Sequence, residues 1–147
     1  MPGYAQRQSQ RQGSPRREAM ERIHAAKMAY ITDRLNLTAE QSSGFIPVYR
    51  DYEGEMKSSR KLFLQKYKGM DIESADDATS MQYIDDNLDY QQKAIQIKRK
   101  YNDLFLKVIS AQQVAELNKA EREFKQILMK RMEERREQRR GGGGRWR

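Results

Sequence analysis

Apolar side chains recur at three- and four-residue spacing along four segments of the chain, which predicts four amphipathic helices. The first segment follows Ser14 and Pro15, a capping residue and a proline suited to the first helical position. Its stripe, interrupted once by a lysine stem, comprises Met20, Ile23, Lys27, Tyr30, Ile31 and Leu35. No segment alternates apolar and polar residues with a period of two, so we expect no β-sheet.

Three further stripes follow. The second, which ends near Gly69, comprises Phe45, Tyr49, Tyr52, Met56, Phe63 and Tyr67. The third opens after Glu73 and Ser74 and comprises Met81, Ile84, Leu88, Ile95, Tyr101, Phe105 and Val108. The fourth comprises Val114, Leu117, Phe124, Ile127, Leu128 and Met132, and we expect it to dissolve into the polar run "ERREQRR". The predicted fold is all-α, with four long helices arranged as two successive helical hairpins in a thin, cradle-like body.

Two similar motifs mark the predicted starts of the second and fourth helices. In "TAEQ", the Thr38 hydroxyl can accept from the amide of Gln41 while the Gln41 side chain reaches back to the amide of Thr38. In "SAQQ", Ser110 and Gln113 repeat this capping box 72 residues later. A box taken singly predicts only a helix start, which contributes roughly 1 kcal/mol.

The residues around the boxes differ between the two copies. Ile109 precedes the second box and can pack against Val114 as a hydrophobic staple, whereas Leu37 before the first box would meet Ser42. Pro47 lies inside the second helical stripe, where it removes one backbone hydrogen bond and should bend the helix.

Composition limits the kind of body that these helices can form. The 147 residues are 37% hydrophobic and 34% charged, with a mean hydropathy of -1.07. Such a chain cannot fill a thick core, so we expect a homodimer that covers a remaining apolar face. No run of 18 apolar residues occurs, so we expect no membrane span.

The net charge of +8 is concentrated at the two ends of the chain. Residues 1–22 hold five arginines against two glutamates, and residues 130–147 hold eight basic side chains against three glutamates. The organisation that we expect is a disordered tail over 1–14, a helical domain over 15–139, and a flexible Gly/Arg tail over 140–147.

The motifs, read together with their positions, resemble the LTxxQ-motif family of small periplasmic helical proteins, the group of Spy and CpxP. "LTAEQ" from Leu37 to Gln41 matches the motif in full, and "ISAQQ" from Ile109 to Gln113 is a conservative variant. The resemblance covers about Met20 to Met132. It implies a cradle-shaped helical dimer outside the cytoplasm that holds client proteins without ATP or senses envelope stress.

The resemblance leads to specific expectations. We expect an ATP-independent chaperone that binds unfolded proteins in the periplasm, with a signal peptide that ends before Ala5 removed. Exposed tyrosines and methionines suit varied clients, because their side chains are amphipathic or flexible. The candidate client-binding residues are Phe45, Pro47, Tyr49, Tyr52 and Met56.

Other classes of function find less support in the sequence. His24 is the only histidine and cysteine is absent, so neither a soft metal site nor a nucleophile paired with a base is expected. Asp85, Asp86 and Asp89 are more typical of a solvated helix face. We therefore expect no catalytic residue, no metal and no cofactor.

Two alternatives remain beside the chaperone. One is a regulatory protein that uses the same cradle to bind a single envelope partner. The other is nucleic-acid binding through "RMEERREQRRGGGGRWR", in which arginine would pair with phosphate and Trp146 would stack on a base. The interleaved glutamates and the single aromatic residue of that segment disfavour nucleic acid as a partner.

Overall fold

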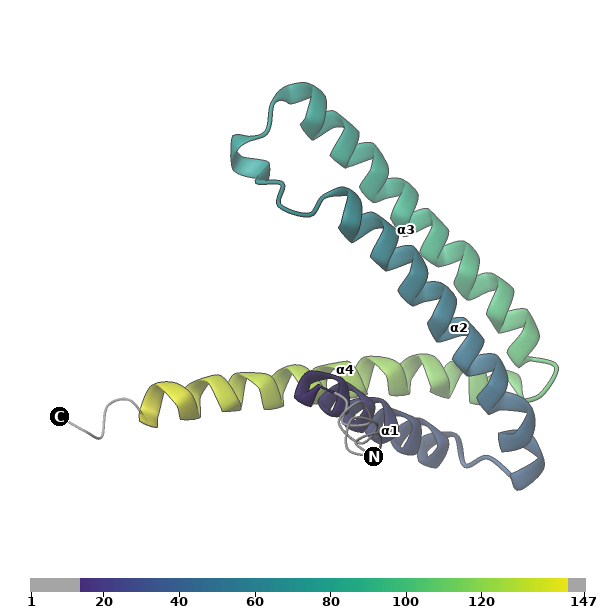
Figure 1. Ribbon diagram of the computed structural model, residues 1–147. Helices are drawn as coiled ribbons and strands as arrows, with labels where there is room; N and C mark the ends of the chain where they lie inside the picture. Colours follow the sequence, from purple (N-terminus) through teal and green to yellow (C-terminus); the bar gives the residue numbers. More distant parts are fainter. Residues whose placement is uncertain (1–13, 143–147) are drawn as a thin grey trace, which may run out of the picture. The chain divides into compact units, whose positions relative to one another are not determined.

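The computed structural model describes residues 14–142, and within them the fold is all-α with four long helices (Figure 1). The helices are α1 (Pro15–Leu35), α2 (Ala39–Lys66), α3 (Asp77–Phe105) and α4 (Ala111–Gly142), and a short 3₁₀ turn, η1 (Ile72–Ser74), lies between α2 and α3. The predicted tails over 1–13 and 143–147 lie outside the described residues.

Local signals explain where most helices begin. Ser14 Oγ accepts from the amide of Arg17 at 3.2 Å, with Pro15 in the first turn of α1, as predicted. The third helix begins later than expected, because Asp76 rather than Ser74 caps it by accepting from the amide of Thr79 at 2.8 Å. Asn36 ends α1 in the left-handed conformation, which asparagine tolerates better than most residues.

The expectation that α4 dissolves into "ERREQRR" is wrong, because the helix continues through Arg139 and Arg140 to Gly142. Glutamate, arginine and glutamine are all good helix formers, so a polar sequence does not by itself end a helix. Residues 140–142, which were expected to begin a flexible tail, are therefore helical.

The helices also pair differently from the expected two successive hairpins. They form two compact units, one spanning residues 37–114 and the other combining residues 1–36 with 115–147. In the first unit α2 packs along α3 as a hairpin (Figure 1). In the second, α1 contacts α4 through Tyr30 and Phe124, whose ring centroids lie 5.9 Å apart. Amphipathic stripes specify a face to bury but not the partner that buries it.

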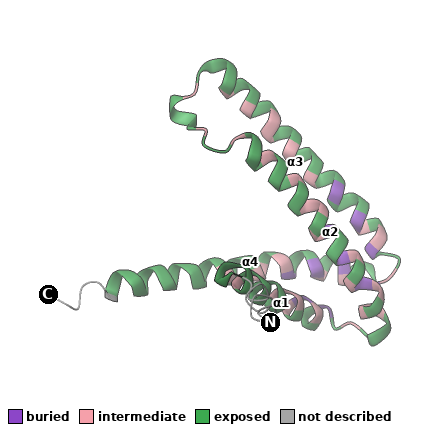
Figure 2. Ribbon diagram, in the orientation of Figure 1, coloured by how far each residue is buried: buried purple, intermediate pink, exposed green. Residues whose placement is uncertain are grey.

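Burial is uneven along the α2–α3 hairpin (Figure 2). We call the part that contains the start of α2 and the end of α3 its basal half, and the part that contains the end of α2 and the start of α3 its distal half. The buried side chains of both helices lie in the basal half: Phe45, Tyr49, Tyr52, Ile97, Tyr101 and Phe105. The distal half has half-buried aromatics but no fully buried side chain among the described residues.

Candidate functional site

The two capping boxes form, and their glutamines bond directly to each other. Thr38 and Ser110 each accept from the amide of the glutamine three residues later, at 3.1 Å in both boxes. In return, the Oε1 of Gln41 accepts from the amide of Thr38 at 3.1 Å, and the Oε1 of Gln113 accepts from the amide of Ser110 at 2.9 Å. Both predicted reciprocal boxes are therefore present.

The bonds between the two glutamines connect residues 72 positions apart. Gln41 Nε2 donates to Gln113 Oε1 at 2.9 Å, and Gln113 Nε2 donates to Gln41 Oε1 at 3.1 Å. Each side-chain oxygen thus accepts one bond from its own helix start and one from the other glutamine, which uses both of its lone pairs. We call this arrangement the glutamine joint. It explains why the chain carries the motif twice, because one box supplies the partner of the other.

Neighbouring residues allow the joint to close. A Cβ atom added at Gly44 would lie 3.0 Å from Cγ1 of Val108, so α2 approaches the segment before the second box more closely than a side chain would permit. Ile109 and Val114, the predicted staple, are both buried. Leu37, for which no staple was expected, is half-buried.

Three of the five candidate client-binding residues are core residues, which corrects that expectation. Phe45 and Tyr49 are fully buried and Tyr52 is 7% exposed, so none of them offers a surface to a client. Their rings pack against α3: Phe45 lies 5.3 Å from Phe105, measured between ring centroids. Tyr52 lies 5.5 Å from Tyr101. Their spacing correctly predicted an apolar stripe, but that stripe meets another helix.

The other two candidates lie partly or wholly at the surface. Pro47 is exposed inside α2, and Met56 is half-buried. Neither adjoins a cluster of exposed apolar side chains on α2 within the described residues, because Leu62 and Leu64 follow in the distal half.

The exposed apolar surface lies chiefly on α3, where the sequence analysis merged two stripes into one. Tyr83, Tyr90 and Ile97 recur every seven residues on the packed face, and the first two contact Phe63 of α2. A second series, offset by two residues, points away from α2 and is 53–66% exposed: Met81, Ile84, Leu88 and Ile95. We call this second series the α3 stripe. The parallel heptad spacing of the two series is the signal that could have separated them.

Polar contacts between α2 and α3 line an open groove of about 980 Å³ on the hairpin. Lys66 Nζ lies 2.6 Å from Asp86 Oδ2, which also accepts from the hydroxyl of Tyr67. Lys66 and then Tyr67 hold the pKa of the Asp86 carboxyl below its usual value. Burial, followed by the hydrogen bond to Asp86, raises the pKa of Tyr67 to about 12.

A similar set of contacts lies farther toward the basal half. Glu55 accepts from Lys100 at 2.7 Å and from the hydroxyl of Tyr101 at 2.9 Å. The Lys100 ammonium and then the Tyr101 hydroxyl lower the pKa of Glu55. Burial and the bond to Glu55 raise the pKa of Tyr101 to about 12. Since the acids and bases of the groove are paired with each other, these contacts hold the hairpin together.

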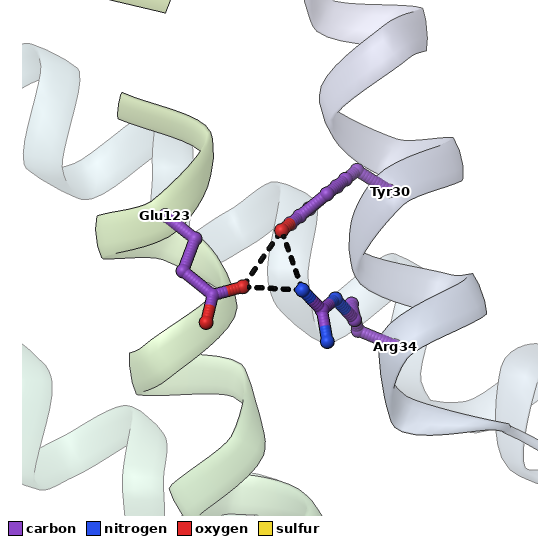
Figure 3. A network of polar contacts seen from close by, with 3 residues as sticks. All are labelled: Tyr30, Arg34 and Glu123. Carbon is purple, nitrogen blue, oxygen red and sulfur yellow. Dashed lines mark hydrogen bonds and ion pairs between the residues drawn. The ribbon is translucent and has the colours of Figure 1, made fainter. Parts of the chain in front are cut away.

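In the other unit, Tyr30, Arg34 and Glu123 form a triangle of contacts between α1 and α4 (Figure 3). The Tyr30 hydroxyl donates to Glu123 at 2.7 Å, and Arg34 donates to Tyr30 at 3.1 Å and to Glu123 at 2.8 Å. The bond from Tyr30 first, and then the charge of Arg34, lower the pKa of Glu123. Sequence reasoning missed this triangle, because a glutamate on a charged helix carries no signal of its partner.

Neither a metal site nor a membrane span occurs in the part of the chain that the structure describes. Within residues 14–142 no group of three His, Cys, Asp or Glu side chains is arranged to hold a metal ion. Asp86 of the acidic run is engaged by Lys66 and Tyr67. No helix among these residues is long and apolar enough to cross a membrane.

Comparison with known proteins adds no relative to this picture: no protein-family model, no curated protein and no solved structure matches the chain.

Proposed function

We propose that the protein is an ATP-independent holdase that binds unfolded protein segments on the α3 stripe. The observation that carries the proposal is the exposure of the four stripe residues, from 53% for Ile95 to 66% for Met81. A contiguous apolar surface of this kind is rare on proteins without binding partners. The resemblance of "LTAEQ" and "ISAQQ" to the LTxxQ motif supports the same function.

The chemistry of the stripe fits an extended, varied client. Met81 is flexible and polarisable, and Ile84 and Leu88 present apolar side chains about one turn apart. Gln91 and Gln92 stand where the next members of the stripe would fall, so the apolar surface is short and has a polar interruption. Short apolar segments of an unfolded chain match such a surface better than a long coiled-coil partner, which needs an unbroken seam.

Replacing Ile84 and Leu88 together by glutamine tests the proposal. Both side chains are 57% exposed, so the free energy of unfolding should change by no more than about 0.5 kcal/mol. Suppression of client aggregation, followed by light scattering without ATP, should fall strongly. A matched control replaces Met129 and Met132 of α4, which are 55% and 51% exposed, by glutamine and should protect as the parent does.

Full protection by the Ile84→Gln, Leu88→Gln variant would refute the placement of clients on the stripe. The number of clients separates a chaperone from a regulator. A holdase should protect several unrelated aggregating proteins, whereas a regulatory protein would bind one folded envelope partner and protect none of them.

The proposal includes a periplasmic location and a homodimer. Fractionation of cells that express the full gene tests the location, and a cytoplasmic protein would contradict it. Sedimentation at concentrations on the order of tens of micromolar, where modest interfaces assemble, tests the dimer. A monomer at those concentrations would overturn the dimer but would leave client binding on the stripe intact.

A further inference from the structure

The last turns of α4 separate acidic and basic side chains onto opposite sides of the helix. At about 100° per residue, Glu133, Glu134 and Glu137 fall within one sector, roughly 100° wide. Arg135, Arg136 and Arg139 fall within a sector of similar width that is centred nearly opposite. In the sequence these residues are interleaved, and that interleaving argued against a basic surface. The helix removes the objection, because it turns the glutamates away.

Exposed methionines share the basic side of the helix. Met132 falls between the angular positions of Arg139 and Arg136, and Met129 falls beside Arg136. Their side chains are 51% and 55% exposed, respectively. We call the surface formed by these two methionines with Arg135, Arg136 and Arg139 the basic face. It presents apolar groups first and guanidinium groups next along the helix axis, without a carboxylate among them.

The arginines of the basic face are available for a partner. Ion pairs elsewhere engage Arg34, Lys66 and Lys100. Among residues 14–142, no ion pair involves Arg135, Arg136 or Arg139, and each is exposed. The end of α4 is exposed on all sides over residues 129–141 (Figure 2). A partner could therefore approach the basic face without displacing another part of this helix.

We propose that the basic face binds the surface of an anionic lipid bilayer. Guanidinium groups pair with lipid phosphates, and the methionines, together with the arginine stems, enter the boundary between headgroups and acyl chains. The methionines favour lipid over nucleic acid, since a phosphate backbone offers nothing apolar to insert into, and no aromatic ring stands on this face to stack on a base. The basic face lies on α4, separate from the α3 stripe, and does not depend on client binding.

The test is co-sedimentation of the full chain with vesicles of phosphatidylcholine, with and without an equal part of phosphatidylglycerol. The chain should bind the anionic vesicles and not the neutral ones. Replacing Arg135, Arg136 and Arg139 by glutamine should weaken binding by roughly a hundredfold, because each arginine near an anionic surface contributes about a fivefold factor. Replacing the same three by lysine keeps the charge and should retain most of the binding.

A matched control removes three exposed cations from the hairpin: Arg60→Gln, Lys61→Gln and Arg99→Gln. Its net charge falls by the same amount, yet its binding should change by less than about fivefold. Equal losses in the two glutamine triples would mean that net charge alone drives binding, and would overturn the proposal.

The methionines distinguish lipid from other anions. Met129→Gln with Met132→Gln should weaken vesicle binding most at high salt, where the charges are screened and insertion remains. Binding to duplex DNA should be weaker than binding to the vesicles and should not compete with it. If DNA binds more tightly, and the methionine variant behaves as the parent on vesicles, the basic face is a nucleic-acid surface and the lipid assignment is wrong.

Discussion

The two halves of the α2–α3 hairpin use the same kinds of residue for different ends. In the basal half, Phe45, Tyr49 and Phe105 interlock until almost no ring surface meets water. In the distal half, Phe63 stacks on Tyr90 at 4.9 Å between centroids, yet both remain half-buried. The exposed leucines and the α3 stripe surround this second cluster.

The difference lies in how many elements meet in each half. The basal half adjoins the connection from α3 to α4, and Ile109 and Val114 of that connection are buried together with the rings. The distal half has only two helices, and a pair of helices cannot enclose a core between them. An aromatic stripe therefore becomes a packed core where other buried residues adjoin it, and an accessible surface where they do not.

The largest expected effect comes from a cavity in the basal half. Phe105→Ala should lower the free energy of unfolding by about 3–5 kcal/mol, because its ring is 2% exposed and surrounded by other rings. Tyr90→Ala in the distal half should cost about 1–2 kcal/mol, since part of that ring already meets water. Urea denaturation measures both. Equal losses would show that the two halves are packed alike.

Pro47→Ala examines a helix interruption in the basal half. The substitution restores a backbone hydrogen-bond donor and should leave stability unchanged or raise it by up to about 3 kcal/mol. Client protection should stay at the parent level, because Pro47 lies on α2 and the proposed client surface is the α3 stripe. A stable variant that protects poorly would bring the basal half into client binding, and light scattering beside a melting curve decides the matter.

The glutamine joint should contribute less than the core but should show coupling. Thr38→Ala and Ser110→Ala should each lower stability by about 0.5–2 kcal/mol through loss of a cap. Gln41→Ala and Gln113→Ala should not be additive, because each glutamine supports both helix starts. A double-mutant cycle measured by denaturation should give a coupling of at least about 0.5 kcal/mol. Additive losses would mean that the two boxes act separately.

Alkaline titration gives the smallest and most local contrast. Tyr67 and Tyr101 both have a pKa raised to about 12, above the ordinary value of 10, so the fold favours the neutral phenols. The stability that they contribute is fully present below pH 10 and is lost as the pH rises toward 12. Tyr101 is 4% exposed, so its phenolate should form only as the basal half opens.

Phenolate absorbance and helical circular dichroism, followed together, test this contrast. Tyr101→Phe should move alkaline unfolding to higher pH, whereas Tyr67→Phe should remove one ionisation and leave the unfolding midpoint in place. Identical shifts in the two variants would indicate that Tyr67 is as firmly enclosed as Tyr101.

Much of the secondary structure could be predicted because its signals act within a few residues. Ser14 with Pro15, and the two capping boxes, set helix starts through bonds that reach no farther than three positions. The extension of α4 into "ERREQRR" was missed because polarity was given more weight than the helix propensity of Glu, Arg and Gln.

Tertiary structure alone decided which faces meet. The same apolar periodicity fits several helix pairings, and packing of ring shapes selected α2 with α3. Two heptad series on α3 compete for one partner, and the aromatic one was chosen, which left Met81 and Leu88 in water. The bond between Gln41 and Gln113 follows from the same selection. A residue's spacing is a local property of the chain, whereas its partner depends on the shapes of side chains far away in sequence.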